Sequence, residues 1–215
     1  MKFTFTPTLV ATAVATLFSA SAHAVLISAE SAGQTTTTEV TGATVEDFND
    51  SICGTYTSCV GAYKIFDTPS GAGQSAPPAG ISSPYLSVPN PLQNGSVTLS
   101  LGTTANYFGL FWGSIDNYNT LTFLSGITEV ASFTGTQVAA EIPGAASGNQ
   151  TSDFSNRFFN FYFGDQLFDA VKLTSNGFAF ETDNHTFATV SEPGTLALLA
   201  LGLTSLVAVR RRKQA

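Results

Sequence analysis

Short apolar segments separated by turn residues follow one another along the second half of the chain. Each segment is rich in Val, Phe, Tyr and Thr, and Gly, Asn, Asp or Ser separates it from the next. Helical spacing of apolar residues is hard to find outside the two ends of the chain. The predicted strands are residues 96–101, 106–112, 119–124, 127–133, 157–163, 168–175 and 178–182. Regularly spaced short strands predict a mainly β fold, an antiparallel jelly-roll-like β-sandwich.

The segments differ in how their apolar residues are placed. Residues 127–133 alternate between apolar and polar positions, as in a strand with one solvent face. Residues 157–163 are apolar on both faces, which predicts a strand in the interior of a sheet. Residues 28–50 are Thr-rich and only loosely patterned, and residues 68–84 concentrate Gly, Pro and Ser. The second of these stretches predicts a long loop.

The first 24 residues have the three parts of a secretory signal peptide. Lys2 provides the positive start, residues 9–18 are apolar, and Ala22 and Ala24 form an A-x-A cleavage site. The apolar stretch is shorter than the roughly 20 residues that span a bilayer, which argues against an uncleaved anchor. We therefore expect signal peptidase to cut after Ala24, so that an exported mature protein starts at Val25.

The exported body, residues 25–190, is strongly acidic. It holds three cations, Lys64, Arg157 and Lys172, against fourteen carboxylates, a net charge of −11. Such a surface repels nucleic acid and anionic lipid, so nucleic acid is excluded as a partner. About 166 residues are enough for one domain with a core of its own.

Two cysteines, Cys53 and Cys59, are separated by five residues that include Gly, Thr and Ser. In an oxidising compartment such a pair forms a disulfide. A metal site would need more ligands than this chain offers. We predict a Cys53–Cys59 disulfide that closes a small loop at the edge of the domain.

The residue types of the body exclude most kinds of catalytic site. Removal of His23 with the signal peptide leaves His185 as the only histidine, which excludes a His-rich zinc site. The chain has neither a G-x-S-x-G elbow nor a Gly-rich phosphate loop. Paired carboxylates could serve a glycosidase, but spacing along the sequence does not place them at the required separation. We predict a non-enzymatic protein without catalytic residues.

One candidate binding site lies in a polar loop between two predicted strands. It consists of Trp112, Asp116, Asn117, Tyr118 and Asn119. An aromatic platform beside acids and amides suits a sugar, whose ring has an apolar face and hydroxyl edges. The alternative, which the pattern favours, is a hairpin loop in which Asp and Asn make turns and the Trp packs in the core. Exposure of the indole ring distinguishes the two.

A second candidate site consists of Glu181, Asp183 and Asn184. These residues offer hard oxygen ligands directly after the apolar positions Phe178 and Phe180, and calcium takes six to eight such oxygens. A structural calcium is the only cofactor that the sequence suggests. The alternative is a last strand capped by polar residues.

An apolar segment at residues 195–209 is followed by a basic cluster. Fifteen residues form a helix of about 22 Å, shorter than the roughly 30 Å hydrocarbon core. Such a helix can still span if the bilayer thins, and the cations would hold its end in the cytoplasm. The basic residues are Arg210, Arg211, Arg212 and Lys213. We predict a single transmembrane helix with a basic stop.

Residues 191–215 resemble the PEP-CTERM sorting signal of Gram-negative bacteria, which combines a Pro-Glu-Pro motif, a short transmembrane helix and an Arg-rich end. The motif residues here are Ser191, Glu192, Pro193 and Gly194, with serine in place of the first proline. The resemblance implies recognition by an exosortase in the inner membrane, cleavage near the motif, and release to the cell surface or extracellular matrix. Residues 106–123 and 168–184 also resemble small β-rich domains often attached to such signals.

The sequence therefore predicts a non-enzymatic exported protein that an exosortase sorts to the cell surface or exopolysaccharide matrix. Its parts are a signal peptide (1–24), a secreted β-sandwich (25–190) and a sorting signal (191–215). Two alternatives stay open. The body could be a carbohydrate-binding module for exopolysaccharide, or the whole chain could be a permanently tail-anchored periplasmic protein.

Overall fold

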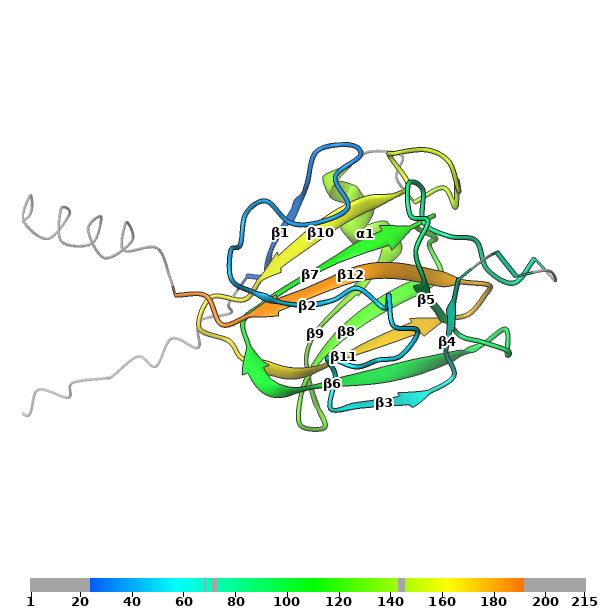
Figure 1. Cartoon of the computed structure of the whole chain (residues 1–215). Coiled ribbons are helices and arrows are strands. Elements are labelled where there is room, and N and C mark those ends of the chain that lie inside the picture. Colours follow the sequence, from blue (N-terminus) through cyan, green and yellow to red (C-terminus); the bar gives the residue numbers. More distant parts are fainter. Residues whose placement is uncertain (1–23, 68, 71–72, 143–145, 192–215) are drawn as a thin grey trace, which may run out of the picture.

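Two antiparallel β-sheets lie face to face in the computed structural model, with the apolar core between them (Figure 1). The structure describes residues 24–67, 69–70, 73–142 and 146–191. The predicted signal peptide up to residue 23 and the sorting signal from residue 192 onward lie outside these ranges.

Seven strands form the larger sheet and five the smaller one. The larger sheet contains β1 (Leu26–Ala29), β2 (Thr44–Glu46), β4 (Lys64–Phe66), β5 (Tyr85–Val88), β7 (Tyr107–Gly113), β10 (Arg157–Tyr162) and β12 (Phe180–Ala188). The smaller sheet contains β3 (Ser58–Gly61), β6 (Gly95–Ala105), β8 (Asn119–Ser125), β9 (Thr128–Thr134) and β11 (Phe168–Ser175). A short helix, α1 (Gly135–Val138), and a 3₁₀ turn (Ala139–Glu141) follow β9.

Strands β5 to β12 follow the order of a jelly roll: they alternate between the two sheets except for β8 and β9, which form a hairpin in the smaller sheet. The larger sheet runs β10-β7-β12-β5 through its centre, and the smaller one runs β6-β11-β8-β9. Two Greek keys that share a sandwich produce this order. The predicted jelly-roll-like antiparallel sandwich is therefore confirmed, with β1 to β4 added around it.

All seven predicted strands are present, and residues 157–163 correspond to β10, an interior strand between β1 and β7. The last predicted strand ends too early, because β12 continues to Ala188. Its polar residues 181–184 lie within the strand rather than capping it. The described residues of the predicted loop 68–84 hold no helix or strand.

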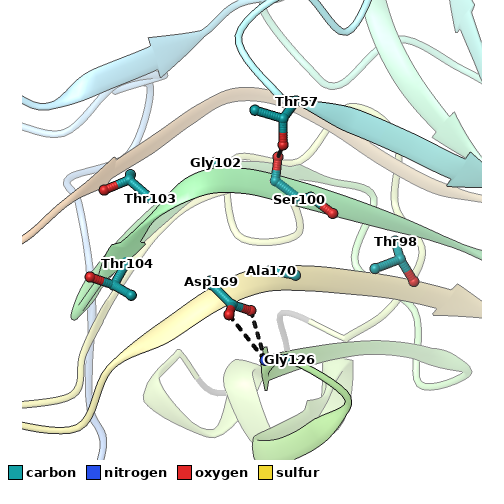
Figure 2. Close-up of a pocket in the computed structure, with 9 residues that line it drawn as sticks. All are labelled: Thr57, Thr98, Ser100, Gly102, Thr103, Thr104, Gly126, Asp169 and Ala170. Carbon is teal, nitrogen blue, oxygen red and sulfur yellow. Dashed lines mark hydrogen bonds between the residues drawn. The ribbon is translucent and has the colours of Figure 1, made fainter.

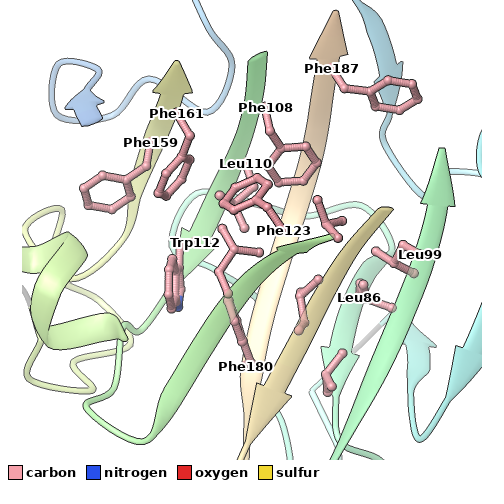
Figure 3. Packing of buried hydrophobic residues seen from close by; sticks show 14 of the residues in the cluster. Leu86, Leu99, Phe108, Leu110, Trp112, Phe123, Phe159, Phe161, Phe180 and Phe187 are labelled. Atoms are coloured by element: carbon pink, nitrogen blue, oxygen red, sulfur yellow. The ribbon is translucent and has the colours of Figure 1, made fainter. Parts of the chain in front are cut away.

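Aromatic rings fill the space between the sheets (Figure 3). Phe123 of β8 makes edge-on contacts with Phe108 of β7 and Phe168 of β11, at ring-centroid separations of 5.7 and 5.0 Å. Each fully buried aromatic side chain removes a large apolar area from water. The core thus depends on the apolar positions of the predicted strands.

Cys53 and Cys59 form the predicted disulfide. Cys59 lies on β3, opposite Leu99 of β6, and β3 is an edge strand of the smaller sheet. The bond closes a ring of few residues, so restriction of the unfolded chain contributes on the order of 2 kcal/mol. The prediction of a small cross-linked loop at the domain edge is confirmed.

The strand register shows that the ends of the described chain and the long loops lie at opposite ends of the sandwich. One row across the larger sheet pairs Leu26 with Tyr162, Tyr162 with Tyr107, and Tyr107 with Ala188. The described chain starts and ends beside this row, which we call the tail end (Figure 1). At the opposite end, Gly113 pairs with Glu181. We call that end, with residues 73–79, 114–118, 146–156 and 176–179, the loop end.

Candidate functional site

Trp112 lies in the core. Its side chain is 0% exposed and stacks on Phe180, with ring centroids 4.2 Å apart and 20° between the planes (Figure 3). Its Nε1 has no hydrogen-bond partner among the described residues. A buried ring cannot stack on a sugar, so Trp112 does not form the surface platform considered from the sequence. The favoured alternative, a tryptophan packed in the core beside a structural turn, is what the structure shows.

Other residues of that loop form hydrogen bonds with the end of β11 and with the turn between β11 and β12. The Tyr118 hydroxyl donates to the Phe178 carbonyl at 2.8 Å, and the Ser175 hydroxyl donates to Asn119 Oδ1 at 2.8 Å. Asp116 is partly buried, and desolvation raises the pKa of its carboxyl group. Asn117 is exposed. The candidate sugar-binding residues are therefore divided between the core, a structural turn and the surface.

Glu181, Asp183 and Asn184 do not converge on one point. Glu181 accepts hydrogen bonds from the Ala76 N–H at 3.1 Å and the Ser114 hydroxyl at 3.0 Å. Asp183 Oδ1 accepts from the Asn184 N–H, whereas the Asn184 side chain donates to the Thr35 carbonyl. Within the described ranges, no group of three or more His, Cys, Asp or Glu residues could hold a metal ion.

Burial dominates the electrostatics of β12. Desolvation raises the pKa of Glu181 to about 7 and outweighs the hydrogen bonds from Ala76 and Ser114. Desolvation also raises the pKa of Asp183 to about 7, with a further contribution from the charges of Asp47 and Glu46. Each carboxylate therefore opposes folding when it is ionised at neutral pH.

A pocket of about 220 Å³ opens beside Glu181 at the loop end. The half-buried Phe178 ring and the Gln74 and Gln150 amides line it. The buried Ser75 also lines it, and its side chain interacts with that of Tyr85. No local pattern in the sequence indicates this pocket, because its residues come from three separate segments.

A groove of about 490 Å³ lies on the outer face of the smaller sheet, where β6 bulges away from β11 (Figure 2). Phe168 pairs with Ala105 but Ala170 pairs with Ser100, so Asp169 faces four residues of β6. Both carboxylate oxygens of Asp169 accept from the Gly126 N–H at 3.0 Å, which fastens the β8–β9 turn to β11 (Figure 2). The remaining polar lining consists of the hydroxyl groups of Thr57, Thr98, Ser100, Thr103 and Thr104.

Substitution of Gly102, at the bulge, by alanine is expected to lower the free energy of unfolding by about 1–3 kcal/mol. Its φ of +75° disfavours a side chain, and an added Cβ would lie 2.3 Å from Thr57 Cγ2. Denaturant unfolding measures the loss. Gly126→Ala is the matched control, because Gly126 also has a positive φ but no atom within 4 Å of an added Cβ. Equal losses in both variants would show that contact with Thr57 contributes nothing.

Asn106 holds the chain immediately before the predicted sorting motif. Its Oδ1 accepts from the Val190 N–H at 2.6 Å, and its Nδ2 donates to the carbonyls of Val190 at 2.8 Å and Gly164 at 2.6 Å. The Thr189 hydroxyl donates to the Thr104 carbonyl at 2.9 Å. These hydrogen bonds attach Thr189 and Val190 to the body of the domain. We call these contacts the Asn106 clamp.

Comparison with solved structures gives weak similarities. The lectin domain of lectinolysin, in complex with Lewis B antigen, is 11% identical with a TM-score of 0.37, covering 61% of this chain and 93% of its own. CpGH89CBM32-6 produced by Clostridium perfringens is 10% identical with a TM-score of 0.35, covering 60% of this chain and 94% of its own. The jelly-roll assignment rests on the strand order. No curated protein matches the chain.

The C-terminal segment matches a known motif. Residues 189–213 match the PEP-CTERM protein-sorting motif. The predicted motif residues Glu192, Pro193 and Gly194, the apolar segment 195–209 and the basic cluster 210–213 fall in this match, beyond the described residues. No helix in the part that the structure describes is long and apolar enough to span a membrane. The protein thus joins a jelly-roll domain to a PEP-CTERM protein-sorting motif.

Proposed function

We propose that this is a non-catalytic protein that a Gram-negative bacterium exports, and that an exosortase delivers to the cell surface or exopolysaccharide matrix. The match of residues 189–213 to the PEP-CTERM motif carries this proposal. The signal peptide predicted at residues 1–24 supports it, because the body must cross the inner membrane before a membrane enzyme can process its tail.

The environment of His185 supports a role without catalysis. It is the only histidine of the mature chain, and it is fully buried. Its ring nitrogens pair with the hydroxyls of Tyr56 at 2.8 Å and Thr182 at 2.7 Å, and burial lowers its pKa to about 3. A general base needs access to its substrate and a pKa near the working pH. His185 meets neither requirement.

The test is the intact mass of the protein recovered from medium, surface wash and membranes of its native host, with and without the exosortase. We expect a species that starts at Val25 and ends near Ser191, found only when the enzyme is present. Substitution of Glu192 and Pro193 by alanine should abolish its release. Glu129→Ala, an exposed change on β9, is the control and should leave release unchanged. A full-length tail that stays in the membrane in both strains would indicate a permanently anchored protein instead.

A further inference from the structure

We propose that the loop-end pocket beside Glu181 binds a single neutral sugar unit, such as a hexose or N-acetylhexosamine of an exopolysaccharide. The inference rests on the proposed surface or matrix location for its natural ligand, and it assigns the binding role to residues other than the Trp112 loop. The pocket residues in question are Phe178, Gln150, Gln74, Ser75 and Glu181.

The pocket combines the groups that a sugar ring requires. Phe178 supplies an apolar face, and its ring is only half buried, unlike that of Phe180. The Gln74 and Gln150 amides can donate to and accept from hydroxyls on the ring edge. The mixture of one aromatic ring with a few polar groups is typical of small-molecule sites.

Glu181 adds unused hydrogen-bonding capacity at the buried side of the pocket. Each Glu181 oxygen accepts one hydrogen bond from the protein, whereas a carboxylate can accept about four in total. A hydroxyl group of a ligand could therefore donate a further hydrogen bond to Glu181.

Volume and charge narrow the ligand class. A pocket of about 220 Å³ is smaller than sites for drug-sized ligands, which begin at roughly 300 Å³, and therefore suits one ring rather than several. Glu181 is the one carboxylate among the described lining residues, too few for a calcium site. The body carries a net charge of −11, so an acidic polysaccharide would be repelled.

The groove on the outer face of the smaller sheet is less suitable for binding a sugar than the loop-end pocket is. Its described lining holds hydroxyls and one carboxylate but no aromatic ring, and that carboxylate is already engaged by the Gly126 N–H. It gives no stacking surface for the apolar face of a sugar. The loop-end pocket has both parts of the required chemistry.

The test is saturation-transfer NMR on the purified full-length chain in detergent, with glucose, galactose, mannose, N-acetylglucosamine and galacturonate as probes. We expect at least one neutral sugar to bind and galacturonate to bind more weakly. Gln150→Ala should lower the affinity roughly tenfold, and Phe178→Ala by at least as much. Gln150 is exposed, so its substitution should leave the fold intact.

Phe154→Ala is the matched control, because Phe154 lies in the same loop as Gln150 but is 61% exposed and outside the pocket lining. It should bind as the unchanged protein does, and circular dichroism should show that all three variants are folded. The proposal is overturned if no neutral sugar binds, if galacturonate binds best, or if the three variants bind equally. This NMR experiment uses purified protein and does not depend on export. Its result can therefore be interpreted even if the sorting experiment fails.

Discussion

Substitution of Trp112 by alanine should lower the free energy of unfolding by about 3–5 kcal/mol. The ring is fully buried, stacks on Phe180 and meets Phe159 edge-on at 6.5 Å between centroids. Its removal loses the transfer free energy of the indole and leaves a cavity between the two sheets. Urea unfolding followed by circular dichroism measures the change, because this is the only tryptophan of the chain and fluorescence is lost with it.

Two variants make this result specific. Trp112→Phe should retain most of the stability, since it keeps an aromatic ring and removes an Nε1 group that is buried without a partner in the described structure. Phe154→Ala changes an exposed ring and should shift stability by less than about 0.5 kcal/mol. A loss below about 1 kcal/mol for Trp112→Ala would contradict the buried position of the indole.

Substitution of Glu181 by glutamine should stabilise the protein by about 3 kcal/mol at about pH 8 and have little effect at about pH 4. Burial raises the pKa of Glu181 from 4.5 to about 7, so the folded state favours the protonated carboxyl. The protonated carboxyl therefore contributes stability that is fully present below the unfolded pKa of about 4.5 and is lost as the pH rises to about 7. Each unit of pKa difference corresponds to about 1.4 kcal/mol of stability. Glutamine is neutral throughout and keeps an oxygen to accept from the Ala76 N–H.

Subtraction of the two stability curves isolates this group. Asp183, whose pKa is also raised to about 7, lowers the stability of the protein as the pH rises, as Glu181 does. His185, whose pKa is lowered to about 3, lowers the stability of the protein as the pH falls below about 6.5. Both contributions cancel in the difference between variant and unchanged protein. Glu129→Gln on the exposed face of β9 should give a difference near zero at both pH values. A pH-independent difference for Glu181→Gln would refute the assigned cause.

Stability and the proposed binding role oppose each other at Glu181. An ionised carboxylate in a desolvated pocket destabilises the fold, yet it is also the strongest hydrogen-bond acceptor that the pocket offers to a hydroxyl group. Functional groups are often retained at such a cost. We therefore expect Glu181→Gln to be more stable at neutral pH and weaker in sugar binding.

The strands that could be predicted are those whose pattern is strong in the local sequence. Residues 157–163 are apolar on both faces because β10 is covered on both sides, and such a run is visible without the fold. Strands β2 and β4 have only three residues each, too few for a pattern, and they form through pairing with β12 and β5. Their existence depends on tertiary structure.

The sites were harder to predict for a related reason. An aromatic residue beside a polar loop suits both a sugar platform and a core contact, and only the packing of Trp112 on Phe180 distinguishes them. Glu181 was identified by its oxygen chemistry, but its pocket includes Gln74 and Gln150, which are distant in sequence. In the sequence, Asn106 is one polar residue at the start of a predicted strand. Its hydrogen bonds to Val190 could not be predicted, because only the folded structure brings the two residues together.

The Asn106 clamp also limits how far the domain could lie from the membrane in an anchored intermediate. In a membrane-anchored intermediate, residues 191–194 alone join the clamped Val190 to the predicted span at residue 195, a tether of less than about 20 Å when fully extended. The tail end of the sandwich would then rest close to the bilayer, and the nine residues of β12, at roughly 3.3 Å each, carry the loop end about 30 Å farther out. In that proposed intermediate, the tether and the length of the sandwich together would limit how far the pocket lies from the membrane, and a longer tether would raise that limit.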